Sequence, residues 1–369
     1  MTGLLNDVMH DRADTLGAPD LDLAAIVAVG GRRLRRRRVA TGLVAAAFAG
    51  TVAVGGLGAM SVFGPGAELV PQAPVIERGP AYAIGRTIAV GAQSYTVPHR
   101  VTSLVQTDDG LLYTSPDGSV WLYDGADSER VGRAANQRLR TDDTGSLAAW
   151  VDTAEDGHPQ YVVYDTGTRS EVARVDDNAA GPSIESTDRG ADVFAVDDGS
   201  AYWRHDGALV RYDVASGDET VLSNATAQIE DVAGGRIAYI VEESSERGWG
   251  IAVDDRIAPG APPLAEASNG FLSPDGRLLT AEEYDSISVY STESGRKVTP
   301  TVEGYMYAVG FGWSADDVVT VLGLTDFSEE SATGDVLTCD VSDDECTVVS
   351  SFEAVDPQRV VLAVGDPVT

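Results

Sequence analysis

Phe271-Leu272-Ser273-Pro274-Asp275-Gly276-Arg277-Leu278-Leu279 is the stretch that decides the fold. Its apolar ends flank a Ser-Pro-Asp-Gly turn, and Asp-Gly suits the tight turn of a β-hairpin because glycine accepts positive φ. A second copy reads Ser115-Pro116-Asp117-Gly118-Ser119-Val120-Trp121. We expect each aspartate to bond the backbone of its own turn. The predicted repeat-turn residues are Ser115, Asp117, Gly118, Ser273, Asp275 and Gly276.

Short apolar runs divided by turns continue on both sides of these copies, from Ala81 onward. The runs are rich in β-branched and aromatic residues, and they show no helical period. Six of them end at an equivalent position, each 37 to 49 residues after the one before. These positions are Tyr123, Tyr164, Tyr212, Val253, Tyr290 and Cys339. A period of this length is typical of the blades of a β-propeller.

The two ends of this repetitive region indicate how the ring closes. A hairpin-like pair, 81–84 and 87–97, precedes the first repeat, and the apolar run 360–364 follows the last. If the first and last strands share a sheet, no sheet edge stays open between them. We therefore predict an all-β propeller over residues 81–369, with seven blades favoured and six as the alternative.

The two Ser-Pro-Asp-Gly copies resemble the hairpin of WD40-like propellers of the TolB type. The copy at 271–279, which runs on into Ile287-Ser288-Val289-Tyr290, carries most of the likeness. The Trp-Asp dipeptide of the family is absent. The layout of the whole chain is similar to uncharacterised membrane proteins of high-GC Gram-positive bacteria. Some of those are suspected companions of extracytoplasmic-function sigma factors, which implies a possible link to signalling.

An arginine block followed by an apolar segment decides the predicted topology. The 25 residues from Val39 to Phe63 contain no charged side chain. As a helix they would extend about 37 Å, which exceeds a hydrocarbon core of about 30 Å. Arginines on the N-terminal flank place residues 1–38 in the cytoplasm and the C-terminal domain outside the cell membrane. The block consists of Arg32, Arg33, Arg35, Arg36, Arg37 and Arg38.

A cleaved export signal is the alternative to this single-pass membrane helix. The region before the arginines is long for a signal peptide, the apolar run is longer than usual, and no cleavage site stands out. We therefore expect residues 39–63 to stay as a transmembrane helix in contact with the lipid bilayer. Residues 64–80, with four prolines, are expected to form an extended tether. Residues 1–31 are either a docking segment for a cytoplasmic partner or a loose tail.

Charge and cysteine content limit the function further. The chain carries 58 acidic and 26 basic side chains, a net charge of −32. We expect no nucleic-acid partner, because phosphate binding depends on Lys and Arg. Six residues separate Cys339 from Cys346, and the two are predicted to form a disulfide across a hairpin, with free thiols as the alternative.

No catalytic motif, cofactor fingerprint or metal-ligand spacing is present in the sequence. Seven Asp-Asp pairs are interpreted as solvated turns rather than calcium loops, since no Asp-x-Asp-x-Asp-Gly loop with a distal Glu accompanies them. We expect no catalytic residue, no cofactor and no metal site. The pairs begin at Asp108, Asp142, Asp176, Asp197, Asp254, Asp316 and Asp343.

These features favour a membrane-anchored, extracytoplasmic propeller that binds a protein or a cell-envelope ligand without turning it over. One alternative is a transmembrane signalling accessory, in which occupancy of the exterior domain changes the behaviour of residues 1–38. The other is a hydrolase or lyase acting on envelope glycans. Convergent buried carboxylates at one mouth of the ring would favour the enzyme.

Overall fold

The computed structural model describes residues 76–155, 157–177, 191–205, 208–223, 228–242, 249–258, 261–267, 269–283, 286–328, 331–354 and 360–366. The chain divides into two compact units, Met1–Pro71 and Gln72–Thr369, and every described residue belongs to the second. The predicted cytoplasmic segment, arginine block, membrane helix and tether as far as residue 75 therefore lie outside the described residues. Within the described ranges, no helix is long and apolar enough to cross a membrane.

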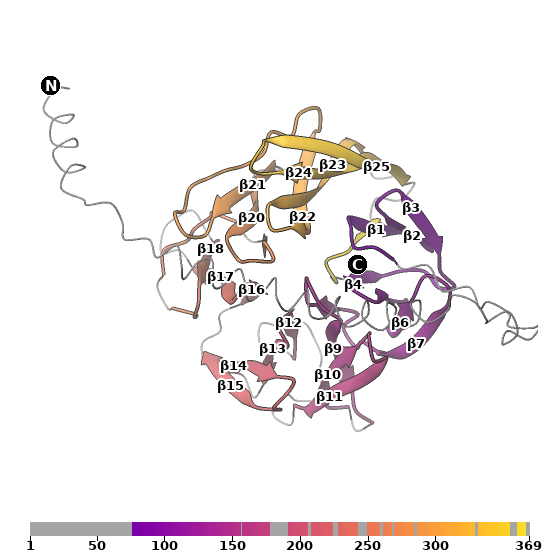
Figure 1. Ribbon diagram of the computed structural model, residues 1–369. Coiled ribbons are helices and arrows are strands. Elements are labelled where there is room, and N and C mark those ends of the chain that lie inside the picture. The colour runs from indigo at the N-terminus through magenta and orange to yellow at the C-terminus, as the bar shows by residue number, and fades with distance from the viewer. Residues whose placement is uncertain are drawn as a thin grey trace, which may run out of the picture. The chain divides into compact units, whose positions relative to one another are not determined.

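Seven antiparallel sheets form in the described residues and follow one another around a ring (Figure 1). The first sheet contains β1 (Ala81–Ile84), β2 (Thr87–Val90), β3 (Gln93–Thr96) and β26 (Val360–Leu362). The next three contain β4 (Ser103–Thr107), β5 (Gly110–Thr114), β6 (Ser119–Tyr123), β7 (Ser128–Arg133); β8 (Arg140–Thr141), β9 (Leu147–Thr153), β10 (Pro159–Asp165), β11 (Ser170–Asp176); and β12 (Val193–Asp197), β13 (Ser200–His205), β14 (Ala208–Asp213), β15 (Glu219–Ser223).

The last three sheets complete the ring. They contain β16 (Ile229–Ala233), β17 (Arg236–Glu242), β18 (Trp249–Asp254); β19 (Gly270–Leu272), β20 (Leu278–Glu283), β21 (Ser286–Ser291); and β22 (Tyr307–Ala315), β23 (Val318–Phe327), β24 (Ala332–Asp340), β25 (Glu345–Ala354). In the two three-stranded sheets, single bridges at Ala265 and Lys297 take part of the place of a fourth strand.

The observed sheets confirm the predicted period and the seven-bladed ring. Each of the six repeat positions falls on the last or next-to-last residue of the third strand of its sheet, as Tyr164 does in β10. From β4 to β22 the first strand of each sheet contacts the first strand of the next, and β26 of the closing sheet contacts β4, so these strands are innermost. The closing sheet joins both ends of the domain, since Tyr82 of β1 pairs with Leu362 of β26.

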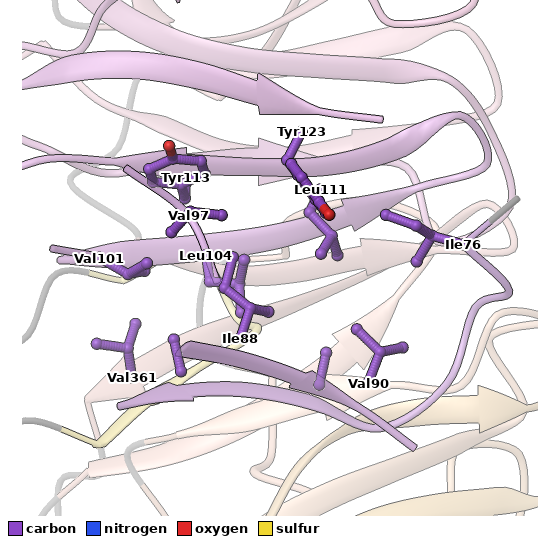
Figure 2. Packing of buried hydrophobic residues seen from close by; sticks show 12 residues of the cluster. Ile76, Ile88, Val90, Val97, Val101, Leu104, Leu111, Tyr113, Tyr123 and Val361 are labelled. Carbon is purple, nitrogen blue, oxygen red and sulfur yellow. The ribbon is translucent and has the colours of Figure 1, made fainter. Parts of the chain in front are cut away.

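The hydrophobic core consists of seven apolar clusters, each packed between two neighbouring sheets. Figure 2 shows the cluster between the closing sheet and the β4–β7 sheet, where Ile88, Leu104 and Val361 come together. Burying each of these side chains stabilises the fold by about 2 kcal/mol. Ile76 is buried in the same cluster, so the packing of the propeller begins five residues before the predicted boundary at residue 81.

Four outer strands each carry a single-residue β-bulge at an apolar residue. In β7, for example, Gly132 pairs with Val120 and Arg130 pairs with Trp121, which leaves Val131 without a partner in the register. The same interruption occurs in β11, β15 and β25. The residues concerned there are Val172, Leu222 and Val349. A bulge of this kind bends its strand and increases the local twist.

The predicted disulfide is confirmed. Cys339 of β24 and Cys346 of β25 are register partners across one hairpin, with their sulfur atoms 2.07 Å and their Cα atoms 4.0 Å apart. Cys339 is fully buried in the cluster between the last two sheets. The bond therefore ties an outer strand to the core.

Candidate functional site

The two predicted Ser-Pro-Asp-Gly copies form the same turn at two different places in the fold. The Ser115 and Ser273 hydroxyls donate to the Asp117 and Asp275 carboxylates at 2.7 and 2.8 Å. Each aspartate also accepts the backbone N–H two residues further on, at 3.1 Å in both copies. The prediction that the aspartates bond their own turns is confirmed. The hydrogen bond from Ser115, with those from Ser119, lowers the pKa of Asp117 to about 2.

The two turns do not belong to one site. Residues 115–118 join the second and third strands of their sheet, β5 and β6, whereas residues 273–276 join the first and second strands, β19 and β20. Successive turns of an antiparallel sheet alternate between its two ends. The copies therefore lie on opposite faces of the ring, and each stabilises its own hairpin.

Charged side chains gather instead on the innermost strands of the ring and on the residues next to them. We call this group the axial cluster; it consists of Arg138, Arg140, Asp192, Glu230, Asp231 and Asp366. The members come from the β8 and β12 sheets, from β16 and from the segment after β26. Because first strands line the axis of a propeller, residues that are far apart in sequence meet there.

Arg140 holds the axial cluster together through contacts with two other parts of the fold, β12 and the segment after β26. Its Nε donates to the carbonyl of Phe194 at 2.9 Å, and its Nη1 donates to the carbonyl of Val364 at 3.1 Å. Its Nη2 donates to Asp366 at 2.9 Å. Arg138 forms ion pairs with Asp192 and with the same Asp366. The two guanidinium groups thus fix the relative positions of β8, β12 and the C-terminal segment.

Two bulges in inner strands contribute to this arrangement. In β12 the register shifts between Val193 and Ala195, and the extra residue is Phe194, whose carbonyl Arg140 binds. In β16 it shifts between Ile229 and Asp231, and the extra residue is Glu230. A bulge re-aims the residue that it inserts. Both insertions therefore change what the inner strands present to the axis.

The carboxyl groups of the cluster have unusual proton affinities. Burial raises the pKa of Glu230 to about 7, although Arg140 opposes the shift. Burial also raises the pKa of Asp231 to about 6, against backbone N–H donation from Leu272 at 2.7 Å and Val232 at 2.8 Å. These two groups gain and lose protons close to neutral pH.

A second set of carboxylates lies where the inner strands turn into the second strands. Burial, with the charge of Asp142, raises the pKa of Asp197 to about 6. Desolvation by the surrounding chain and the charge of Asp231 raise the pKa of Asp143, although this residue is exposed to solvent. The whole axial region is therefore rich in carboxyl groups that resist ionisation.

Arg78, which precedes β1, ties the start of the domain to this region. Its Nη2 donates to the carbonyls of Asp142 at 3.0 Å and Gly145 at 2.6 Å, and its Nη1 donates to the carbonyl of Asp143. Its Nε pairs with Asp108 at 2.7 Å. The described end of the predicted tether, residues 76–80, therefore lies against the turns after β4 and β8.

The interpretation of the aspartate pairs as solvated turns is correct for Asp108 and Asp109, which are exposed. It is wrong for one residue in each of two other pairs, Asp142 and Asp177. Asp142 is buried, and its Oδ1 accepts the backbone N–H of Thr144 at 2.9 Å. Asp177 is buried beneath the hydroxyl of Tyr161, which donates to it at 2.9 Å. In the part of the chain that the structure describes, no group of three or more His, Cys, Asp or Glu could hold a metal ion.

Sequence reasoning missed the axial cluster. Arg138 and Asp192 are 54 residues apart, and Arg140 and Asp366 are 226 residues apart. No local spacing connects such residues. The available signal was positional, because charged residues stand at the start of the first strand in neighbouring repeats.

Comparisons with known proteins concern the fold only. No protein family matches the sequence, and no curated protein matches it either. TolB from Acinetobacter baumannii is 18% identical with a TM-score of 0.42; the match covers 59% of this chain and 62% of that one, less than two thirds of its length.

Two further solved structures are similar. The putative TolB from Agrobacterium tumefaciens is 13% identical with a TM-score of 0.40, over 76% of this chain and 91% of that one. The β-propeller domain of the Trilobed protease from Pyrococcus furiosus is 13% identical with a TM-score of 0.47, over 72% and 86%. The seven-bladed fold itself is established by the sheet order of this chain.

Proposed function

We propose that this protein is a membrane-anchored, extracytoplasmic propeller that binds a protein or a cell-envelope ligand without chemical turnover. The observation that carries the proposal is the axial cluster, which sets two guanidinium groups and several ionisable carboxyl groups on the inner strands of a closed ring. Such fixed charges suit the recognition of a polar or charged ligand.

The rigidity of the scaffold supports this proposal. Each inner strand is held by its own sheet and by an apolar cluster on either side, so the axial side chains keep their positions before a ligand arrives. Preorganisation of this kind reduces the entropy cost of binding. Membrane anchoring and the exterior location rest on the arginine block and the apolar segment 39–63 of the sequence.

The test is membrane crosslinking followed by co-purification from the native cells. The full chain is compared with a chain starting at Arg32 and with the full-length variants Glu230→Gln and Asp343→Asn. We expect a partner that is kept without residues 2–31, is lost from Glu230→Gln and is kept by Asp343→Asn, whose side chain is exposed on another sheet. The proposal would be overturned if the partner were lost only when residues 2–31 are removed. It would also be overturned if no partner co-purified with any of these chains.

One observation favours an enzyme as a second candidate. A carboxyl group with a pKa of about 7, such as Glu230, is suited to act as a general acid near neutral pH. A hydrolase or lyase of envelope glycans would use it to protonate a leaving group. The purified full chain would then release fragments from isolated cell-wall glycan, detected by mass spectrometry, and Glu230→Gln would not. Absence of fragments with the native chain would remove this candidate.

A further inference from the structure

The segment after β26 crosses the inner strands of the ring as a bound peptide would. Ala363 donates its N–H to the carbonyl of Ala81 at 3.2 Å, and Gly365 donates to the carbonyl of Leu104 at 2.9 Å. The carbonyl of Gly365 accepts the N–H of Leu139 at 2.8 Å. Figure 1 shows this yellow segment on the inner side of the ring, beside β1 and β4.

Gly365 lies in a position that has no room for a side chain. Its φ is +78°, and a Cβ there would lie 1.8 Å from the carbonyl oxygen of Leu139. The buried hydroxyl of Ser103 also donates to the Gly365 carbonyl, at 2.7 Å. The contacts around this residue therefore select glycine and recognise its peptide groups.

The next residue, Asp366, lies between two arginines. Its Oδ1 accepts from Nη2 of Arg140 and forms an ion pair with Nε of Arg138, both at 2.9 Å. Burial alone would raise the pKa of Asp366, but the two arginines outweigh burial and hold it below its ordinary value. The carboxylate thus stays ionised in its binding position.

We infer that residues Ala363–Asp366 occupy, within the same chain, a peptide-binding site on the inner strands of the ring. The ligand class is an extended peptide in which glycine is followed by Asp or Glu. The site offers a backbone acceptor at Leu104, backbone and hydroxyl donors at Leu139 and Ser103, a slot for glycine and two guanidinium groups for the acid. This inference rests on the proposed binding function and names its ligand.

Exchange between the chain's own segment and a ligand does not require the ring to open. The segment follows β26, which has three residues and pairs with β1 alone. Residues 363–366 can leave the inner strands while β26 stays paired, because the bonds described above lie beyond its last residue. The ring would remain closed during the exchange.

The experiment uses the full chain truncated after Leu362 and a fluorescent synthetic peptide with the sequence of Ala363–Thr369. We expect the truncated chain to bind this peptide at least tenfold more tightly than the untruncated chain does, as measured by fluorescence anisotropy. Peptides carrying Gly365→Ala or Asp366→Asn should each bind at least tenfold more weakly. Equal binding of all three peptides to the truncated chain would overturn the inference.

A second variant keeps the test decisive if the truncated chain does not fold. The untruncated variant Asp366→Asn keeps every backbone bond of the segment but loses its charge, so we expect it to bind the unchanged peptide more tightly than the native chain. Asp343→Asn is the control and should match the native chain. If Asp366→Asn also matches it, the inference fails. If the crosslinking experiment still captures a partner, the proposed binding function is supported even though the peptide inference has failed.

Discussion

Arg140 donates a hydrogen bond to Asp366 at 2.9 Å across 226 residues of sequence. The bond joins the inner strand β8 to the segment that follows the closing strand β26. Closure of the ring therefore has a polar component in addition to the pairing of β1 with β26 and the apolar cluster around Val361.

Replacing Arg140 should weaken the whole domain. In Arg140→Gln the carbonyls of Phe194 and Val364 and the Asp366 carboxylate lose their donor, which should lower the free energy of unfolding by about 2 kcal/mol. Urea denaturation measures the change. The matched control is Arg277→Gln, whose exposed ion pair with Asp275 should contribute less than about 1 kcal/mol. Equal losses in both variants would contradict the assigned role of Arg140.

Stability should fall as the pH rises from about 4 to about 7. The folded chain raises the pKa of Glu230 from its ordinary value of 4.5 to about 7. It raises the pKa of Asp231 and of Asp197 from 3.8 to about 6. At these three groups the folded state therefore binds more protons than the unfolded state, so their contribution to stability is greatest below this interval and is lost as they ionise.

The variant Glu230→Gln isolates the largest part of this pH dependence. It should reduce the loss of unfolding free energy between pH 5 and pH 8 by on the order of 1 to 3 kcal/mol. Urea denaturation at the two pH values gives the measurement. Glu345→Gln, at an exposed position on β25, should retain the dependence of the native chain. The same dependence in Glu230→Gln would show that its carboxyl group is not the source.

Two glycines with similar backbone conformations should respond differently to alanine. Gly85 and Gly365 have φ values of +62° and +78°, but a Cβ at Gly85 would meet no atom within 4 Å. Gly85→Ala should therefore cost roughly 1 kcal/mol, the cost of the left-handed conformation alone. Gly365→Ala should cost at least twice as much, because the Cβ would collide with the carbonyl of Leu139. Thermal denaturation of the two variants would refute this if their losses were equal.

Removing the disulfide should destabilise the domain modestly. Cys346→Ala frees a short hairpin loop, and the loop-entropy estimate for such a closure is about 2 kcal/mol. A reductant should lower the melting temperature of the native chain towards that of the variant and leave the variant unchanged. If the reductant shifted both equally, the stabilisation would have to come from elsewhere.

Local regularities made most of the fold predictable. The turn dipeptides and the recurring end of the third strand predicted the repeat length of the blades. The apolar runs at 81–84 and 360–364, which lie outside the six repeats, predicted how the ring closes. The equal sequences at Ser115 and Ser273 did not show that one turn follows a second strand and the other a first strand. Both positions require the same turn chemistry, so the motif carries no information about which end of a sheet it occupies.

The axial cluster was not predictable for a different reason. Its members meet only after the ring has closed, and two of the inner strands are shifted by bulges at Phe194 and Glu230. The burial of Asp142 and Asp177 likewise depends on packing that their exposed neighbours in sequence do not share. Composition marks such residues as surface groups, and only the fold shows otherwise.

The single-residue bulges at Val131, Val172, Leu222 and Val349 have a consequence for crowding. A straight outer strand offers unpaired N–H and C=O groups on which another copy could extend its sheet. Copies confined to one surface, as proposed here, would meet each other often and side by side. The four interruptions break the regular row of groups that such sheet extension needs, so four of the seven blades should resist joining edge to edge with a neighbouring copy.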